Sequence, residues 1–202
     1  KQFKVDGLDY IEVREGMGIL NGSSGKWLMK PSAFSAYGAA YPIREIGDDQ
    51  YRFWVPSKLK EGSWMLIDSS GTQLNDALFD FPQRQPYLGL MIVKSDGKYG
   101  LIGTNGDMFL PFDYEAIYFN GGYYCYLKSG LWGIFRAKGK KAKLGETYQI
   151  EPRFTSIINA ISYQDTLRIG VLINDSITYL STELEPLFPL TKIDDLIKNP
   201  FD

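Results

Sequence analysis

The sequence predicts an all-β protein built from about five copies of one small unit, each a three-stranded antiparallel meander. Two observations predict this fold. Short runs rich in aromatic and branched aliphatic residues alternate with turns that contain Gly, Asn and Asp, which is typical of strands joined by hairpins. One pattern, a large residue, then Gly or an aliphatic residue, then a turn, recurs about every 38 residues. A period of this size indicates a repeat architecture.

The pattern is clearest at Tyr99-Gly100-Leu101-Ile102, which is followed by the turn Asn105-Gly106 and by Pro111, Tyr114 and Ile117. We call the large first residue of each copy its anchor, and the five anchors are Met17, Trp64, Tyr99, Trp132 and Ile169. Because Trp64, Tyr99 and Trp132 occupy equivalent positions, we expect their side chains in the core. A glycine directly after an anchor is expected to let a ring or another backbone approach closely, or to mark a bulge.

One meander has too little core to be stable alone, so its neighbours must cover it. We assign residues 1–202 to a single repeat domain, with units at about 9–46, 50–82, 87–118, 122–158 and 161–190 and a C-terminal cap at 191–202. In the last unit, residues 166–168 are expected to form the first strand. The weaker first and last copies favour an open array, and a closed five-bladed, propeller-like ring is the alternative. Thr191 and apolar residues at 193, 196 and 197 predict a short terminal helix.

Two segments, Gly97-Lys98-Tyr99-Gly100-Leu101-Ile102 and Gly130-Leu131-Trp132-Gly133-Ile134-Phe135, are each followed by Pro, an aromatic residue and Ile. They resemble the WG-repeat family. The resemblance covers about residues 10–190 and is best in the third and fourth copies. The sequence departs from the family pattern at Met65, where the family has Gly, and at the anchors Met17 and Ile169. The resemblance implies an all-β, mainly bacterial repeat domain of envelope or secreted settings with a binding role, and it carries over no catalytic or ligand residues.

Composition argues against several classes of function. The chain has no histidine, which removes imidazole catalysis and imidazole metal ligands. It has one cysteine, Cys125, so it can form no internal disulfide, and we expect this residue to be buried in a strand. The formal net charge of −2 gives no general attraction to nucleic acid. We therefore expect a non-enzymatic protein with no cofactor and no metal site.

Two sets of residues are candidates for partner binding. The first is the densest run of positive charge, on the hairpin of the fourth copy, where the interval from the anchor to the closing Pro is longest; a loop lengthened in one repeat is typical of a binding face. The second is a set of aromatic residues outside the anchor positions, which could make exposed contacts. The candidates are Arg136, Lys138, Lys140, Lys141, Lys143, Tyr123, Tyr124 and Trp54.

The sequence thus predicts a binding module, with an unidentified protein as its partner and an anionic polysaccharide or other envelope polymer as the alternative. We expect a secreted, periplasmic or surface-anchored location, with a cytoplasmic location as the alternative. The chain begins at Lys1 rather than Met, and whether a signal or lipid-anchor segment precedes Lys1 stays open. No run of 18 or more apolar residues predicts a membrane-spanning helix. The oligomeric state stays open.

Overall fold

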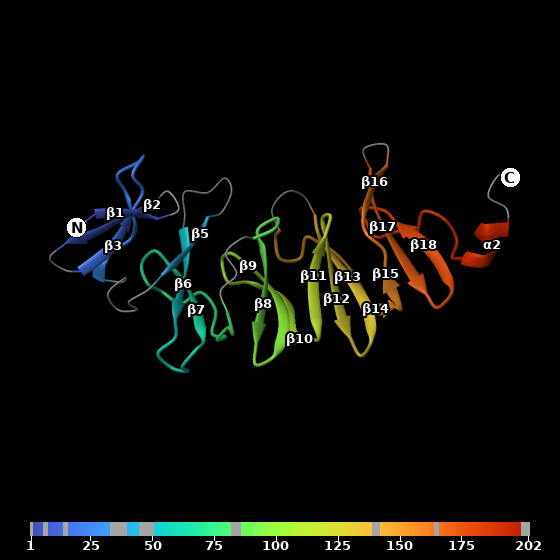
Figure 1. The fold of residues 1–202 in the computed structure, drawn as a ribbon, viewed down its shortest axis with the longest axis horizontal. Helices are drawn as coiled ribbons and strands as arrows, with labels where there is room; N and C mark the ends of the chain where they lie inside the picture. The colour runs from blue at the N-terminus through green and yellow to red at the C-terminus, as the bar shows by residue number, and fades with distance from the viewer. Residues whose placement is uncertain are drawn as a thin grey trace. The chain divides into compact units, whose positions relative to one another are not determined.

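The computed structural model describes residues 2–5, 8–13, 16–32, 40–44, 51–81, 86–138, 142–163 and 166–198. Most of this part of the chain is β-strand, arranged in five antiparallel sheets, and Figure 1 labels most of the strands. Over the described ranges, no sheet closes into a barrel. The all-β class predicted from the sequence is confirmed. Contacts divide the chain into two compact units, Lys1–Phe112 and Asp113–Asp202, which we describe separately.

The first unit holds three sheets that follow one another along the chain. The first sheet comprises β1 (Gln2–Val5), β2 (Leu8–Val13), β3 (Gly16–Leu20) and β4 (Trp27–Met29). The second sheet comprises β5 (Tyr41–Arg44), β6 (Tyr51–Pro56) and β7 (Trp64–Asp68). The third sheet comprises β8 (Leu90–Ser95), β9 (Lys98–Gly103) and β10 (Met108–Tyr114), the last of which crosses into the second unit.

The second unit holds two sheets. The fourth sheet comprises β11 (Ala116–Asn120), β12 (Tyr123–Lys128), β13 (Leu131–Ala137) and β14 (Thr147–Phe154). The fifth sheet comprises β15 (Ser156–Ile157), β17 (Thr166–Ile173), β18 (Ser176–Leu180) and β19 (Thr191–Lys192), with β16 (Ile161–Tyr163) paired to β17. The helix α2 (Ile193–Lys198) follows β19, so the short terminal helix predicted from the sequence is confirmed.

The sheets of the second unit are offset from the units read from the sequence. The sequence unit 87–118 ends inside β11, which pairs with β12 of the fourth sheet. The sequence unit 122–158 ends with β15, which pairs with β17 of the fifth sheet. In the third and fourth copies the closing Pro and aromatic residue lie in β10 and β14, whereas the closing Ile lies in β11 or β15, the first strand of the next sheet. With β11 included, the fourth sheet has four strands rather than the expected three.

Stacking of sheets within a unit follows from the alternation of side chains along a strand. In β6, Phe53 and Val55 pack against the first sheet, whereas Trp54 between them packs against the third sheet. All three side chains are fully buried. A sheet with a neighbour on both faces needs apolar residues at consecutive positions, which is why β6 and β12 read as continuous apolar runs. Within the first unit the sheets thus stack in series, as an open array requires.

The predicted core role of the anchors is met only in part. Trp64 and Trp132 are half-buried and pack against the edges of the core clusters, and Tyr99 is also half-buried, with Lys94 Nζ 5.4 Å from its ring centroid. By contrast, the glycines that follow anchors have the predicted tight surroundings. A Cβ on Gly133 would lie 2.4 Å from the Tyr126 ring. The register of β13 and β14 also shifts beside Gly133, which marks a bulge.

The fifth copy does not follow the register of the fourth. Residues 166–168, expected to form its first strand, begin β17 together with Ile169, and the preceding strand is β16. Trp132 faces the following sheet, whereas Ile169 is fully buried and faces the preceding one. Because side chains alternate between the two faces of a strand, Ile169 is not the structural counterpart of the anchor Trp132.

Candidate functional site

The three aromatic candidates are core residues and offer no exposed ring faces. Trp54, Tyr123 and Tyr124 are each 0% exposed. Trp54 meets the edge of Phe79 at a ring-centroid distance of 4.9 Å, and Tyr124 has a similar contact with Phe119 at 5.1 Å. The expectation of exposed contacts was wrong because sequence alternation does not reveal that both faces of these sheets are covered.

Tyr123 joins the fourth and fifth sheets through its hydroxyl group. The phenol oxygen lies 3.2 Å from the carbonyl oxygen of Leu167 and 3.3 Å from that of Ser181, so its single proton can be donated to either. Burial raises the pKa of the Tyr123 phenol, so it stays a donor at neutral pH. Asn120 reinforces the same junction, since its side-chain oxygen accepts from the backbone N–H of Ala160 at 3.0 Å.

Removing this hydroxyl should weaken the junction without opening the core. We expect Tyr123→Phe to lower the free energy of unfolding by about 1 kcal/mol, because two buried carbonyls lose their shared donor. Urea unfolding followed by tryptophan fluorescence measures the change. The matched control is Tyr99→Phe, which keeps the ring beside Lys94 and whose change should stay within about 0.5 kcal/mol. Equal effects of the two substitutions would contradict the bridging role of Tyr123.

Arg136 also belongs to this junction rather than to the exposed hairpin. Its Nη1 donates to the carbonyl oxygen of Thr182 at 2.7 Å, and its guanidinium carbon lies 5.6 Å from the centroid of the Tyr123 ring. The residue is half-buried. Arg136 therefore fixes the base of the β13–β14 hairpin against the fifth sheet. Its guanidinium contacts the Thr182 carbonyl and the Tyr123 ring rather than facing an external partner.

The hairpin beyond Arg136 does present exposed positive charge. Lys138 is exposed, and its Nζ lies 4.5 Å from the centroid of the Tyr148 ring. Lys143 is exposed, with its Nζ 3.8 Å from Glu146 Oε1. The backbone N–H of Lys138 donates to the carbonyl oxygen of Glu146 at 2.9 Å, which closes the hairpin. The remaining candidates, Lys140 and Lys141, lie outside the described residues. Together with Lys138 and Lys143 they make up what we call the lysine hairpin.

A second candidate surface was missed by the sequence interpretation. On the fifth sheet, Leu172 pairs with Ile177 and Gly170 with Tyr179, all on the face opposite to the core residue Ile169. Leu172, Ile177 and Tyr179 are half-buried. The segment after β18 adds Phe188, which is exposed and whose ring centroid lies 6.1 Å from that of Tyr179. We call Leu172, Ile177, Tyr179 and Phe188 the outer face of the fifth sheet. Leu187, Leu190 and Leu196, nearby in the sequence, are also exposed. The run Leu187-Phe188-Pro189-Leu190 was the available signal, since it follows the last long strand and is apolar.

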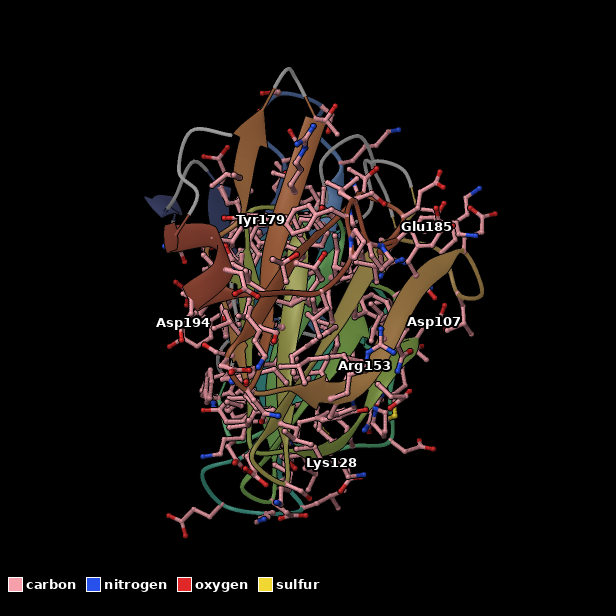
Figure 2. All side chains as sticks on the ribbon, turned by 90° about the vertical axis from the view of Figure 1, so that its right-hand side faces the viewer. Asp107, Lys128, Arg153, Tyr179, Glu185 and Asp194 are labelled. Carbon is pink, nitrogen blue, oxygen red and sulfur yellow. The ribbon has the colours of Figure 1, made fainter. Side chains whose placement is uncertain are left out.

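Acidic side chains border this outer face. Glu183, Glu185, Asp194 and Asp195 are exposed. Figure 2 labels Tyr179 on the fifth sheet, with Asp194 and Glu185 to either side of it in that view. The cations of the same region in the described ranges are Lys192, Lys198 of α2 and the half-buried Arg168. The four carboxylates outnumber these three cations, so the border carries an excess of negative charge.

Two further observations bear on chemistry. Cys125 is buried as expected, and burial raises the pKa of its thiol to about 12, so it is not a reactive thiolate at neutral pH. Among the described residues, no group of three Asp, Glu or Cys side chains is placed to hold a metal ion. Within the same ranges, the structure contains no helix with the length and apolar character needed to cross a membrane.

Comparisons with known proteins give distant likenesses only. No family model and no curated protein matches the sequence. Among solved structures, the chain is similar to Hsv2 of Kluyveromyces lactis, at 13% identity and a TM-score of 0.34, covering 92% of this chain and 61% of Hsv2. It is also similar to PorZ of Porphyromonas gingivalis, described as an essential bacterial surface component of the type-IX secretion system, at 13% identity and a TM-score of 0.35. That match covers 96% of this chain and 26% of PorZ, so the chain spans less than two thirds of either relative.

Proposed function

We propose that this chain is a non-catalytic β-repeat module that binds a protein partner at a bacterial cell envelope or outside the cell. One observation carries the proposal. The lysine hairpin presents exposed cations at Lys138 and Lys143, while Arg136 clamps its base to the fifth sheet. A charged loop on a rigid base loses little conformational freedom on binding, so its charge can be used for recognition. The complementary partner surface is acidic.

Burial of the aromatic candidates favours a protein partner over a polysaccharide. Carbohydrate platforms stack sugars on exposed rings, yet Trp54, Tyr123 and Tyr124 are inside the core. A polymer-binding module remains the second candidate because Trp27 is 39% exposed and four lysines attract polyanions of any kind. The envelope setting rests on the resemblance to WG repeats.

The test is affinity capture with the purified chain from bacterial envelope extract, with and without prior digestion by polysaccharide-degrading enzymes. Replacing Lys138, Lys140, Lys141 and Lys143 by Ser is expected to weaken capture of the partner about tenfold or more, and capture by the native chain should fall as salt is raised. Arg136 is left in place because it supports the fold. The melting temperature should stay nearly unchanged, since exposed lysines contribute little to stability.

A control separates the hairpin from net charge. Serine at four exposed or half-exposed lysines of the β6–β7 and β8–β9 hairpins removes the same charge elsewhere, at Lys58, Lys60, Lys94 and Lys98. If this control weakens capture as much as the hairpin variant does, the lysine hairpin is not the binding site. If capture is abolished by polysaccharide digestion, the polymer-binding alternative replaces the protein partner.

A further inference from the structure

The first and fifth sheets differ from the second and fourth sheets in the same way. In the second and fourth sheets, residues on both faces are fully buried, for example Phe53 and Trp54 in β6 and Tyr123 and Tyr124 in β12. In the fifth sheet, only the face with Ile169 is fully buried. Its outer face has half-buried and exposed apolar residues, which is the character of a sheet that lacks its second neighbour.

The first sheet has a similar outer face. Tyr10 and Ile19 of β2 and β3 belong to the core, so the paired residues beside them point the other way. On that side, Ile11 and Leu20 are half-buried and Trp27 is exposed, with its ring over Gly18, where a Cβ would lie 2.6 Å from Trp27 Cζ3. We call Ile11, Leu20 and Trp27 the outer face of the first sheet.

The two outer faces carry opposite charge at their borders. Lys26 and Lys30 are exposed directly beside β4, which contains Trp27. The acidic residue of this face, Asp9, is buried next to Gly22. The border of the fifth sheet has an excess of carboxylates. Apolar centres with complementary rims are the usual anatomy of a protein interface.

We propose that two copies of this chain associate head to tail, with the outer face of the first sheet of one copy stacked on the outer face of the fifth sheet of the other. Charge selects this arrangement over pairing of like faces, since two fifth-sheet faces would bring carboxylates together and two first-sheet faces would bring lysines together. A head-to-tail contact is heterologous, so it produces larger rings or open chains rather than closed dimers. This self-association uses surfaces other than the lysine hairpin and goes beyond the proposed function.

Sedimentation velocity across a wide concentration range tests the proposal with two charge-reversed variants. One is Lys26→Glu with Lys30→Glu, and the other is Glu185→Lys with Asp194→Lys. The native chain should show a mass that rises with concentration. Each variant alone should associate at least about tenfold more weakly, because its two faces then carry like charge. A mixture of the two variants should regain association, because the two reversed faces are complementary to each other and so are the two native faces.

Other outcomes overturn the proposal. A native chain that stays monomeric at every concentration removes self-association altogether. If only the fifth-sheet variant loses association, two fifth-sheet faces pair with each other. If neither variant loses association, the outer faces do not form the contact. Lys58→Glu with Lys98→Glu makes the same charge change as the first-sheet variant on other hairpins and should leave association unaltered. Circular dichroism of each variant verifies that it is folded, including α2, which contains Asp194.

Discussion

Replacing Trp54 by Ala is expected to lower the free energy of unfolding of this protein by about 3–5 kcal/mol. The indole is fully buried between the second and third sheets and meets the edge of Phe79 at a centroid distance of 4.9 Å. Its removal leaves a cavity lined by residues of two sheets, which can collapse only by moving both. Equilibrium unfolding in urea, followed by far-ultraviolet circular dichroism, measures the loss.

Trp27→Ala is the matched control, because the same side chain is removed from an exposed site. We expect it to cost less than about half as much, since much of the Trp27 surface is already in contact with water. The pair also decides between the two interpretations of Trp54. A loss below about 1 kcal/mol for Trp54→Ala would place this indole at the surface and restore it as a candidate contact residue.

Local signals in the sequence were enough to predict the strands of the clearest hairpins. The β12–β13 hairpin illustrates this, because an apolar run, the turn Ser129-Gly130 and the anchor Trp132 together specify two strands and their connection. Gly130 has a φ of +76°, a conformation that glycine adopts without a steric penalty. The prediction of close approach at Gly133 was equally local, since a glycine inside a strand leaves room that another group fills.

What the sequence could not show is which sheet lies against which face. Tyr123 and Tyr124 are adjacent aromatic residues outside the anchor positions, and on that ground they were candidates for exposed contacts. The structure buries both because each face of the fourth sheet is covered. The closing segments posed the same difficulty, because nothing local indicates that Ile117 pairs with Tyr126 in a later hairpin. In the fifth copy, the large aromatic anchor is absent, and the residue chosen in its place, Ile169, faces the preceding sheet rather than the following one.

The sequence located the lysine hairpin, but it did not show which of its charged side chains are exposed. Arg136 and Lys138 are two residues apart and looked equivalent as charges. In the structure, Arg136 donates to the carbonyl oxygen of Thr182 and lies over the Tyr123 ring. Lys138, by contrast, is exposed to solvent. Charge composition predicts where cations gather, whereas the contacts of each cation depend on residues distant in the sequence, such as Thr182.

The second large effect is expected at the glycine that defines the repeat. Gly133→Ala should destabilise the protein by about 3 kcal/mol, the upper part of the range for overpacking in a core. A Cβ at this position would lie 2.4 Å from the Tyr126 ring and 2.8 Å from the carbonyl oxygen of Ile150. Neither group can move away easily, because the Tyr126 hydroxyl donates to that same carbonyl at 2.8 Å.

Two further variants show whether steric crowding is the cause. A Cβ added at Gly130 would have no neighbour within 4 Å, so Gly130→Ala should cost only the positive φ, about 1–2 kcal/mol. Tyr126→Leu removes the ring that crowds Gly133, so adding Gly133→Ala to it should cost clearly less than Gly133→Ala alone. Such a non-additive cycle, measured by urea unfolding, would show that glycine is needed at position 133 because the Tyr126 ring packs directly against it. Strict additivity would instead mean that the contact with Ile150, or the backbone conformation itself, is what requires glycine there.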